Sequence, residues 1–166
     1  MLYTFLTKLD RIFHFPRARA HCDIPCGIYD PHLAQLAVLT VIRMDDLIAD
    51  LAKAETTDKV AYHNSMTRYI AIKEEHAELC KREVRVIWGD YFKQEHVDKF
   101  PELPNLTHKI FQLGSKARQT ADREVAMQLL EAVNRFAEIY WETKGIATKR
   151  VKAPYKPSEE VVYPVL

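Results

Sequence analysis

Glycine is scarce in this sequence, with 4 residues among 166, which argues against a loop-rich or all-β protein and favours helices. No stretch approaches the roughly 18 unbroken apolar residues of a membrane helix. The formal net charge is only +1, so composition gives no electrostatic reason to expect nucleic acid or a membrane surface as a partner. With 48% hydrophobic and 28% charged residues, the chain is predicted to form one globular domain with a real core.

Cysteine is also rare, and its count is odd. Three cysteines are a poor disulfide framework, and a chain of this size does not need one. We therefore predict a reducing, cytoplasmic setting in which Cys22 and Cys26 are available as thiolates. Cys80 lies on an apolar helical stripe and is predicted to be a buried free thiol.

The first twenty residues end in Ala18-Arg19-Ala20, which has the small-x-small form of a signal-peptidase site. Charged residues interrupt what would be the apolar region of a signal peptide. The hydrophobic residues instead recur at helical spacing, which predicts an amphipathic pro-segment over residues 1–20. A divergent signal peptide is the alternative interpretation.

Four stretches carry apolar residues at the spacing of an amphipathic helix. Asp30 and Pro31 are a typical start for the first, and polar residues 55–58 end it. The others are expected over about 59–90, 103–117 and 125–144, with Gly145 closing the last. Because the connections are short, the predicted fold is all-α, an antiparallel four-helix bundle over 21–145. Residues 146–166, with three prolines, are predicted to be an extended C-terminal tail.

The segment from His21 to Cys26 is a candidate chelator. If a cut after Ala20 makes His21 the chain terminus, its amine, the Cys22 amide nitrogen and the Cys22 thiolate form two fused five-membered rings around one metal. The Cys26 thiolate closes a fourth position, and the His21 imidazole reaches an axial one. Square-planar nitrogen and sulfur donors suit Ni(II) or Cu(II) rather than zinc, and they favour one-electron redox work. A short-range Cys22–Cys26 disulfide or a weak metal contact is the simpler alternative.

The same segment resembles the nickel hook of the nickel superoxide dismutases. Residues 21–29 match the family pattern His-Cys-Asp-x-Pro-Cys-Gly-x-Tyr at every specified position. Further matches follow in order: Ile72-Lys73-Glu74-Glu75, Trp88-Gly89-Asp90-Tyr91-Phe92-Lys93, Phe100-Pro101-Glu102-Leu103 and Tyr140-Trp141-Glu142-Thr143-Lys144. The resemblance covers about residues 21–145.

This resemblance implies disproportionation of superoxide by Ni(II)/Ni(III) cycling, with one nickel ion per chain. The implied ligands are His21, Cys22 and Cys26. Tyr29 and Tyr91 are expected to face the open side of the metal, where their hydroxyls order water or substrate and screen out larger anions. Asp23 is expected to stiffen the hook through local hydrogen bonds.

The resemblance also implies a homohexamer of four-helix bundles and an N-terminal extension that a maturation peptidase removes. That cut falls between Ala20 and His21. Four aromatic side chains that lie partly off the helical stripes agree with an interface between subunits: Trp88, Phe92, Phe111 and Trp141.

One departure concerns the pair of residues, Glu and Arg, that orients the axial imidazole in family members first described. Those positions hold Ala37 and His76 here, so the network must be rebuilt or absent. His76 is interpreted mainly as an exposed helix residue. Lys73, which interrupts the stripe of the second helix, is expected to snorkel outwards or to pair with a carboxylate at a subunit contact. Lys93 either steers superoxide or is a solvated surface lysine.

Two other classes of function remain open from the sequence. One is a non-catalytic bundle that binds or delivers metal through the same hook, and the other is an inactive helical interaction module. The retention of all three ligand residues and of both tyrosines favours the enzyme.

Overall fold

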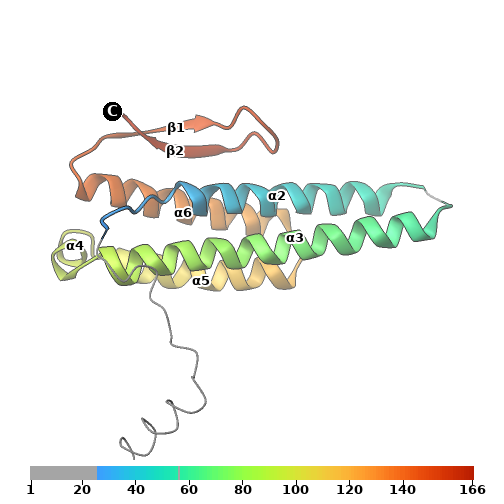
Figure 1. The fold of residues 1–166 in the computed structure, drawn as a ribbon, viewed down its shortest axis with the longest axis horizontal. Coiled ribbons are helices and arrows are strands. Elements are labelled where there is room, and N and C mark those ends of the chain that lie inside the picture. The colour runs from blue at the N-terminus through green and yellow to red at the C-terminus, as the bar shows by residue number, and fades with distance from the viewer. Residues whose placement is uncertain (1–25, 56) are drawn as a thin grey trace, which may run out of the picture.

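The computed structural model describes residues 26–55 and 57–166, so the predicted pro-segment and most of the predicted hook lie outside the described residues. The helical elements are α2 (His32–Lys53), α3 (Lys59–Val86), the π-helix η1 (Ile87–Tyr91), α4 (Gln94–Lys99), α5 (Leu103–Gln119) and α6 (Arg123–Thr143). Two strands follow, β1 (Thr148–Lys152) and β2 (Glu160–Pro164). Figure 1 shows α2, α3, α5 and α6 side by side along one long axis.

Aspartates begin three of the long helices. The Asp30 carboxylate accepts a hydrogen bond from the backbone N–H of His32 (2.8 Å), as the sequence predicts for the start of α2. Asp58 accepts from the N–H of Ala61 at the start of α3. Asp122 accepts from the N–H of Glu124 at the start of α6. Each bond satisfies a backbone donor that lacks a partner in the first helical turn.

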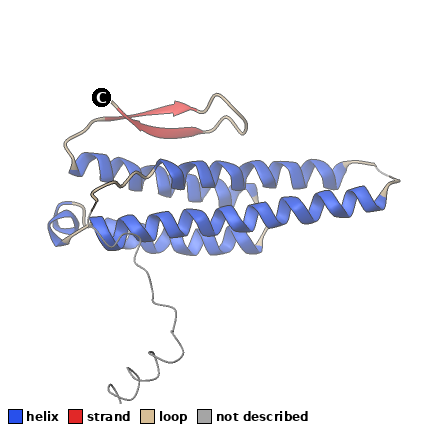
Figure 2. Cartoon of the chain, in the orientation of Figure 1, coloured by secondary structure: helices blue, strands red, loops and turns tan. Residues whose placement is uncertain are grey.

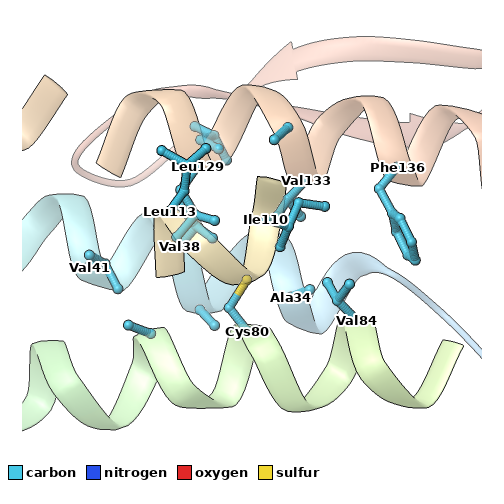
Figure 3. Close-up of a cluster of buried hydrophobic side chains, with 14 of the residues drawn as sticks. Ala34, Val38, Val41, Cys80, Val84, Ile110, Leu113, Leu129, Val133 and Phe136 are labelled. Atoms are coloured by element: carbon cyan, nitrogen blue, oxygen red, sulfur yellow. The ribbon is translucent and has the colours of Figure 1, made fainter. Parts of the chain in front are cut away.

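The four long helices pack as the predicted bundle, which is therefore confirmed. α2 packs against α3 and α6, and α5 packs against the same two helices. Figure 2 shows the helical layer with the two strands to one side of it. Each of the four long helices contributes to one buried cluster, part of which is drawn in Figure 3: Ala34, Val38, Cys80, Val84, Ile110, Leu113, Leu129, Val133 and Phe136.

Cys80 lies inside this cluster as a free and fully buried thiol, which confirms the prediction. Burial raises its pKa to about 12, so the thiol stays protonated at neutral pH. A protonated thiol is a poor metal ligand and a poor nucleophile. Cys80 is therefore a core residue.

The second predicted helix is not a single α-helix. α3 ends at Val86, and the chain continues as the π-helix η1, in which the N–H of Phe92 donates to the carbonyl of Ile87 (3.1 Å). A π-turn takes one residue more than an α-turn, and such turns are frequent at functional sites. The expected stripe to residue 90 therefore changes register at Ile87.

The C-terminal segment differs from the extended tail that the sequence predicts. β1 and β2 form an antiparallel hairpin, in which Arg150 pairs with Val162. The hairpin contacts α2 and α6, and Val161 and Val162 are buried. The side-chain amide of Asn134 donates to the backbone carbonyl of Glu160 (2.8 Å). The prolines 154 and 157 lie in the connection between the strands, where they interrupt no ladder hydrogen bond.

Lys73 neither snorkels outwards nor depends on a carboxylate of a neighbouring subunit, so both sequence-based expectations are wrong. Only 2% of it is exposed. Its ammonium group donates to the carbonyls of Ala117 (2.9 Å) and Thr120, which end α5, and lies 3.9 Å from Asp45 Oδ1 of the same chain. A cation at the carboxyl end of a helix is favourable because the free carbonyls carry partial negative charge. Lys73 thus joins α3, α5 and α2 inside one chain.

Asp45, the carboxylate beside Lys73, is buried without a hydrogen bond from any described residue. Among the residues that the structure describes, neither of its carboxylate oxygens has a hydrogen-bond partner. Burial raises the pKa of Asp45 to about 6, although the Lys73 charge opposes the rise. The ionised carboxylate is therefore stabilised less well in the folded chain than in water.

This shift predicts a pH dependence of stability. Because the folded-state pKa lies above the unfolded value, the folded state binds more protons, and the Asp45 contribution rises as the pH falls from about 7 to about 4. Asp45→Asn should remove this contribution. The difference in free energy of unfolding between wild type and variant should change by about 3 kcal/mol over that range. Urea unfolding of the nickel-free chain measures it, with exposed Asp50→Asn as control. Parallel pH profiles for wild type and Asp45→Asn would contradict the assignment.

Candidate metal centre

Cys26 is the one predicted metal ligand within the described part of the chain. His21, Cys22 and Asp23 lie outside it, as does the predicted cut after Ala20. Cys26 is exposed, and Gly27 follows with a φ of +69°, in the left-handed region that glycine adopts without strain. The chain turns there and leads into Tyr29.

Tyr29 and Tyr91 lie side by side, as the resemblance implies. Their ring centroids are 5.7 Å apart, and the ring planes are tilted by 52°. Tyr29 precedes α2, whereas Tyr91 is the last residue of η1. Both residues are half-buried. Tyr29, three residues after Cys26, is thus in contact with a tyrosine that lies far away in the sequence.

The last turn of α6 holds both tyrosines. The Tyr140 hydroxyl donates to the backbone carbonyl of Tyr29 (2.5 Å). The Tyr91 and Thr143 hydroxyls are 2.7 Å apart, and Thr143 also donates to the carbonyl of Tyr140 (2.6 Å). Burial raises the pKa of Tyr140 well above its ordinary value, so its hydroxyl keeps its proton. Sequence reasoning assigned Tyr140 and Thr143 no role, although both lie in a segment that matches the family.

Two further side chains cover the tyrosine pair. The His96 ring stacks on Tyr91 with a centroid distance of 5.4 Å and an interplanar angle of 9°. The Lys144 ammonium lies 4.9 Å from the Tyr91 ring centroid and 5.2 Å from that of Tyr140. An ammonium at this distance from an aromatic face is attracted by the ring quadrupole. Lys93, the cation that the sequence singled out, is exposed and contributes its backbone N–H, which donates to His96 Nδ1 (3.1 Å).

The two positions that hold an imidazole-orienting Glu and Arg in family members first described are Ala37 and His76 here, which form no such pair. Ala37 is buried in the core. The Nδ1 atom of His76 donates to the carbonyl of Ile72 (2.9 Å) in its own helix. This bond agrees with the interpretation of His76 as a helix residue, but the residue is half-buried rather than exposed.

The donor set tests whether a metal fits. Within residues 26–55 and 57–166 there is no cluster of three or more histidine, cysteine or acidic side chains that would bind a metal ion. The described part therefore offers the exposed Cys26 thiol together with the adjoining tyrosines. The further donors that the sequence predicts are His21 and Cys22, whose nitrogen and soft sulfur atoms would suit nickel. The described helices include none that is long and apolar enough to cross a membrane.

Comparisons with known proteins identify the family. Residues 16–144 match the model of the nickel-containing superoxide dismutases. The nickel superoxide dismutase of Streptomyces coelicolor is 36% identical over 125 residues, which are 75% of this chain and 88% of that protein. The Streptomyces seoulensis enzyme is 33% identical over 138 residues, 82% of this chain and 98% of that one. A native structure of nickel superoxide dismutase superposes with a TM-score of 0.65 at 35% identity, covering 75% of this chain and 99% of that one. The chain therefore belongs to the nickel-containing superoxide dismutase family.

Proposed function

We propose that this chain disproportionates superoxide to oxygen and hydrogen peroxide, with one nickel ion held by His21, Cys22 and Cys26. The observation that carries this proposal is the contact between Tyr91 and Tyr29, which follows Cys26 by three residues. Nickel bound by thiolates and backbone nitrogen supplies one-electron redox chemistry. The terminal amine and imidazole of His21, the amide nitrogen and thiolate of Cys22 and the thiolate of Cys26 form the proposed ligand set.

The residues around the ligands bind and select the substrate. The hydroxyls of Tyr29 and Tyr91 order water or superoxide and screen out larger anions. Lys144 places a positive charge against the same rings, which attracts an anionic substrate. Asp23 stiffens the turn of the hook through local hydrogen bonds.

Maturation and location complete the proposal. A peptidase cuts between Ala20 and His21, because only a free His21 amine closes the first chelate ring. The odd cysteine count and the absence of any need for a disulfide support a cytoplasmic location. The near-neutral net charge gives no support to nucleic acid or a membrane surface as a partner.

The proposed assembly is a homohexamer. Apolar side chains on α3 that the chain itself leaves exposed support it, including Val60, Ile70 and Ile72. Trp88, Phe111 and Trp141 are half-buried at the edge of the core, as expected for residues that a neighbour covers. Phe92, in contrast, is buried within its own chain and gives no support to an interface.

The ligand assignment predicts the effect of removing sulfur. Cys22→Ser and Cys26→Ser each replace a thiolate by a hydroxyl that stays protonated at neutral pH, so nickel content and turnover should both be lost. Cys80→Ser is the matched control, because that thiol is buried in the core; it should keep nickel even if stability falls. Metal analysis and the decay of pulse-generated superoxide measure the two effects. Wild-type turnover with nickel bound in Cys22→Ser would refute the thiolate assignment.

The chelate ring predicts that the uncut chain is inactive. With residues 1–20 attached, the His21 nitrogen is an amide and does not donate as an amine. The full-length chain should bind nickel weakly and show no dismutase activity. The chain that begins at His21 should bind nickel tightly and be active. Intact mass spectrometry beside nickel analysis makes the comparison. Full activity in a preparation with the extension still attached would show that the amine is not a ligand.

The assembly is tested by mass in solution. Multi-angle light scattering of the processed chain should give nearly six times the subunit mass, which is 19.3 kDa before the cut. Val60→Asp, which puts a charge on the exposed face of α3, should lower that mass, whereas Val151→Asp on the hairpin should not. A stable monomer of the wild type at micromolar concentration would exclude the hexamer.

A further inference from the structure

The hydrogen atoms at Thr143 are fully determined by its neighbours. A threonine hydroxyl has one proton to donate. Thr143 donates that proton to the carbonyl of Tyr140, which has none to give (2.6 Å). In the bond between the Tyr91 and Thr143 hydroxyls (2.7 Å), Tyr91 must therefore be the donor.

This direction decides what Tyr91 offers to the site. Its only hydroxyl proton points at Thr143, so the phenolic oxygen has acceptor capacity alone left for a third group. A water molecule can donate to that oxygen, whereas a bare anion meets a lone pair and is disfavoured. Tyr91 therefore accepts a hydrogen bond from ordered water in this arrangement, and it donates to an anion such as superoxide or azide only when the bond to Thr143 opens.

Tyr140, in the same helical turn, donates a second hydrogen bond to the tyrosine pair. Its hydroxyl donates to the backbone carbonyl of Tyr29 (2.5 Å), while only 1% of the residue is exposed. The donor thus comes from the rigid core, and the acceptor belongs to the segment that leads from Cys26 into α2. Lys144 then packs against the rings of Tyr91 and Tyr140 together.

We propose that the last turn of α6 positions the tyrosine pair: Thr143 fixes the direction of the Tyr91 hydroxyl proton, and Tyr140 fixes the backbone that carries Tyr29. The inference rests on the proposed function, in which the two tyrosines border the nickel. Thr143 and Tyr140 are positioning residues, since they act through the tyrosines.

The first experiment follows the Tyr91 hydroxyl proton in the nickel-free full-length chain. Tyrosine labelled with carbon-13 at Cζ reports hydroxyl exchange through its hydrogen–deuterium isotope shift, and the Tyr91 signal is assigned by its loss in Tyr91→Phe. Thr143→Val removes the acceptor with little change of shape. Exchange should become about fivefold faster, the factor that one neutral hydrogen bond supplies. Thr143→Ser should restore the slow rate.

Thr120→Val is the matched control, because the Thr120 hydroxyl also donates to a carbonyl at a helix end (3.0 Å, to Lys116) but caps α5, away from Tyr91. It should leave Tyr91 exchange unchanged. In the nickel-loaded, processed enzyme, azide should inhibit Thr143→Val about fivefold more strongly, because the released Tyr91 proton is free to donate to the anion. Unchanged exchange in Thr143→Val, or a Thr143→Ser variant that behaves like valine, would overturn the role of Thr143.

The second experiment removes the Tyr140 hydroxyl alone. In Tyr140→Phe, backbone hydrogen exchange of the segment 26–30 should become about fivefold faster. Tyr155→Phe, in the connection between β1 and β2, should have no effect on it. Equal exchange in Tyr140→Phe and wild type would overturn the role of Tyr140. These exchange measurements need no nickel, so they succeed or fail independently of the proposed dismutase activity.

Discussion

The hydrogen bond from Tyr140 to the carbonyl of Tyr29 connects the bundle to the segment that carries the chemistry. Within that segment Cys26 is exposed and Ile28 is 78% exposed, whereas the Tyr29 ring packs against the core. Tyr140, in contrast, is anchored in the core among the residues of four helices. A buried donor on α6 therefore fixes the backbone at Tyr29, between the exposed residues that follow Cys26 and the start of α2. The bundle supports this contact, because the close packing of its core fixes the position of the Tyr140 hydroxyl.

Much of this arrangement was open to prediction from the sequence, and the reason differs between elements. The four long helices follow from apolar spacing and from Asp30 at the first cap. The π-helix does not, because one extra residue at Ile87 leaves the apolar pattern almost unchanged over a short stretch. The hairpin was missed because β1 is almost entirely exposed and shows no alternation of burial. Its prolines suggested an extended tail instead.

The candidate site divides in the same way. The family resemblance assigned Tyr29 and Tyr91 to the same side of the metal, and their rings are in contact. Their role there and the ligand roles of His21, Cys22 and Cys26 stay predictions. The parts played by Tyr140, Thr143 and Lys144 were not foreseen, since a hydroxyl acquires a role only when a partner from another helix is placed beside it. Lys73 shows the converse case. Its place on an apolar stripe was recognised, but its partners at the end of α5 follow only from the packing of three helices.

The π-helix has a consequence at the level of the gene. An α-helix turns by about 100° for each residue. Because the π-turn holds one residue more than an α-turn, a regular α-helix over the same residues would carry the side chains after it around the axis by about that angle, and Tyr91 would leave Tyr29 and Thr143. Deleting one codon between Ile87 and Tyr91 while the turn becomes α-helical, in contrast, would keep Tyr91 close to its present direction. The tyrosine pair should therefore tolerate the loss of one residue in this turn better than the loss of one in the middle of α3.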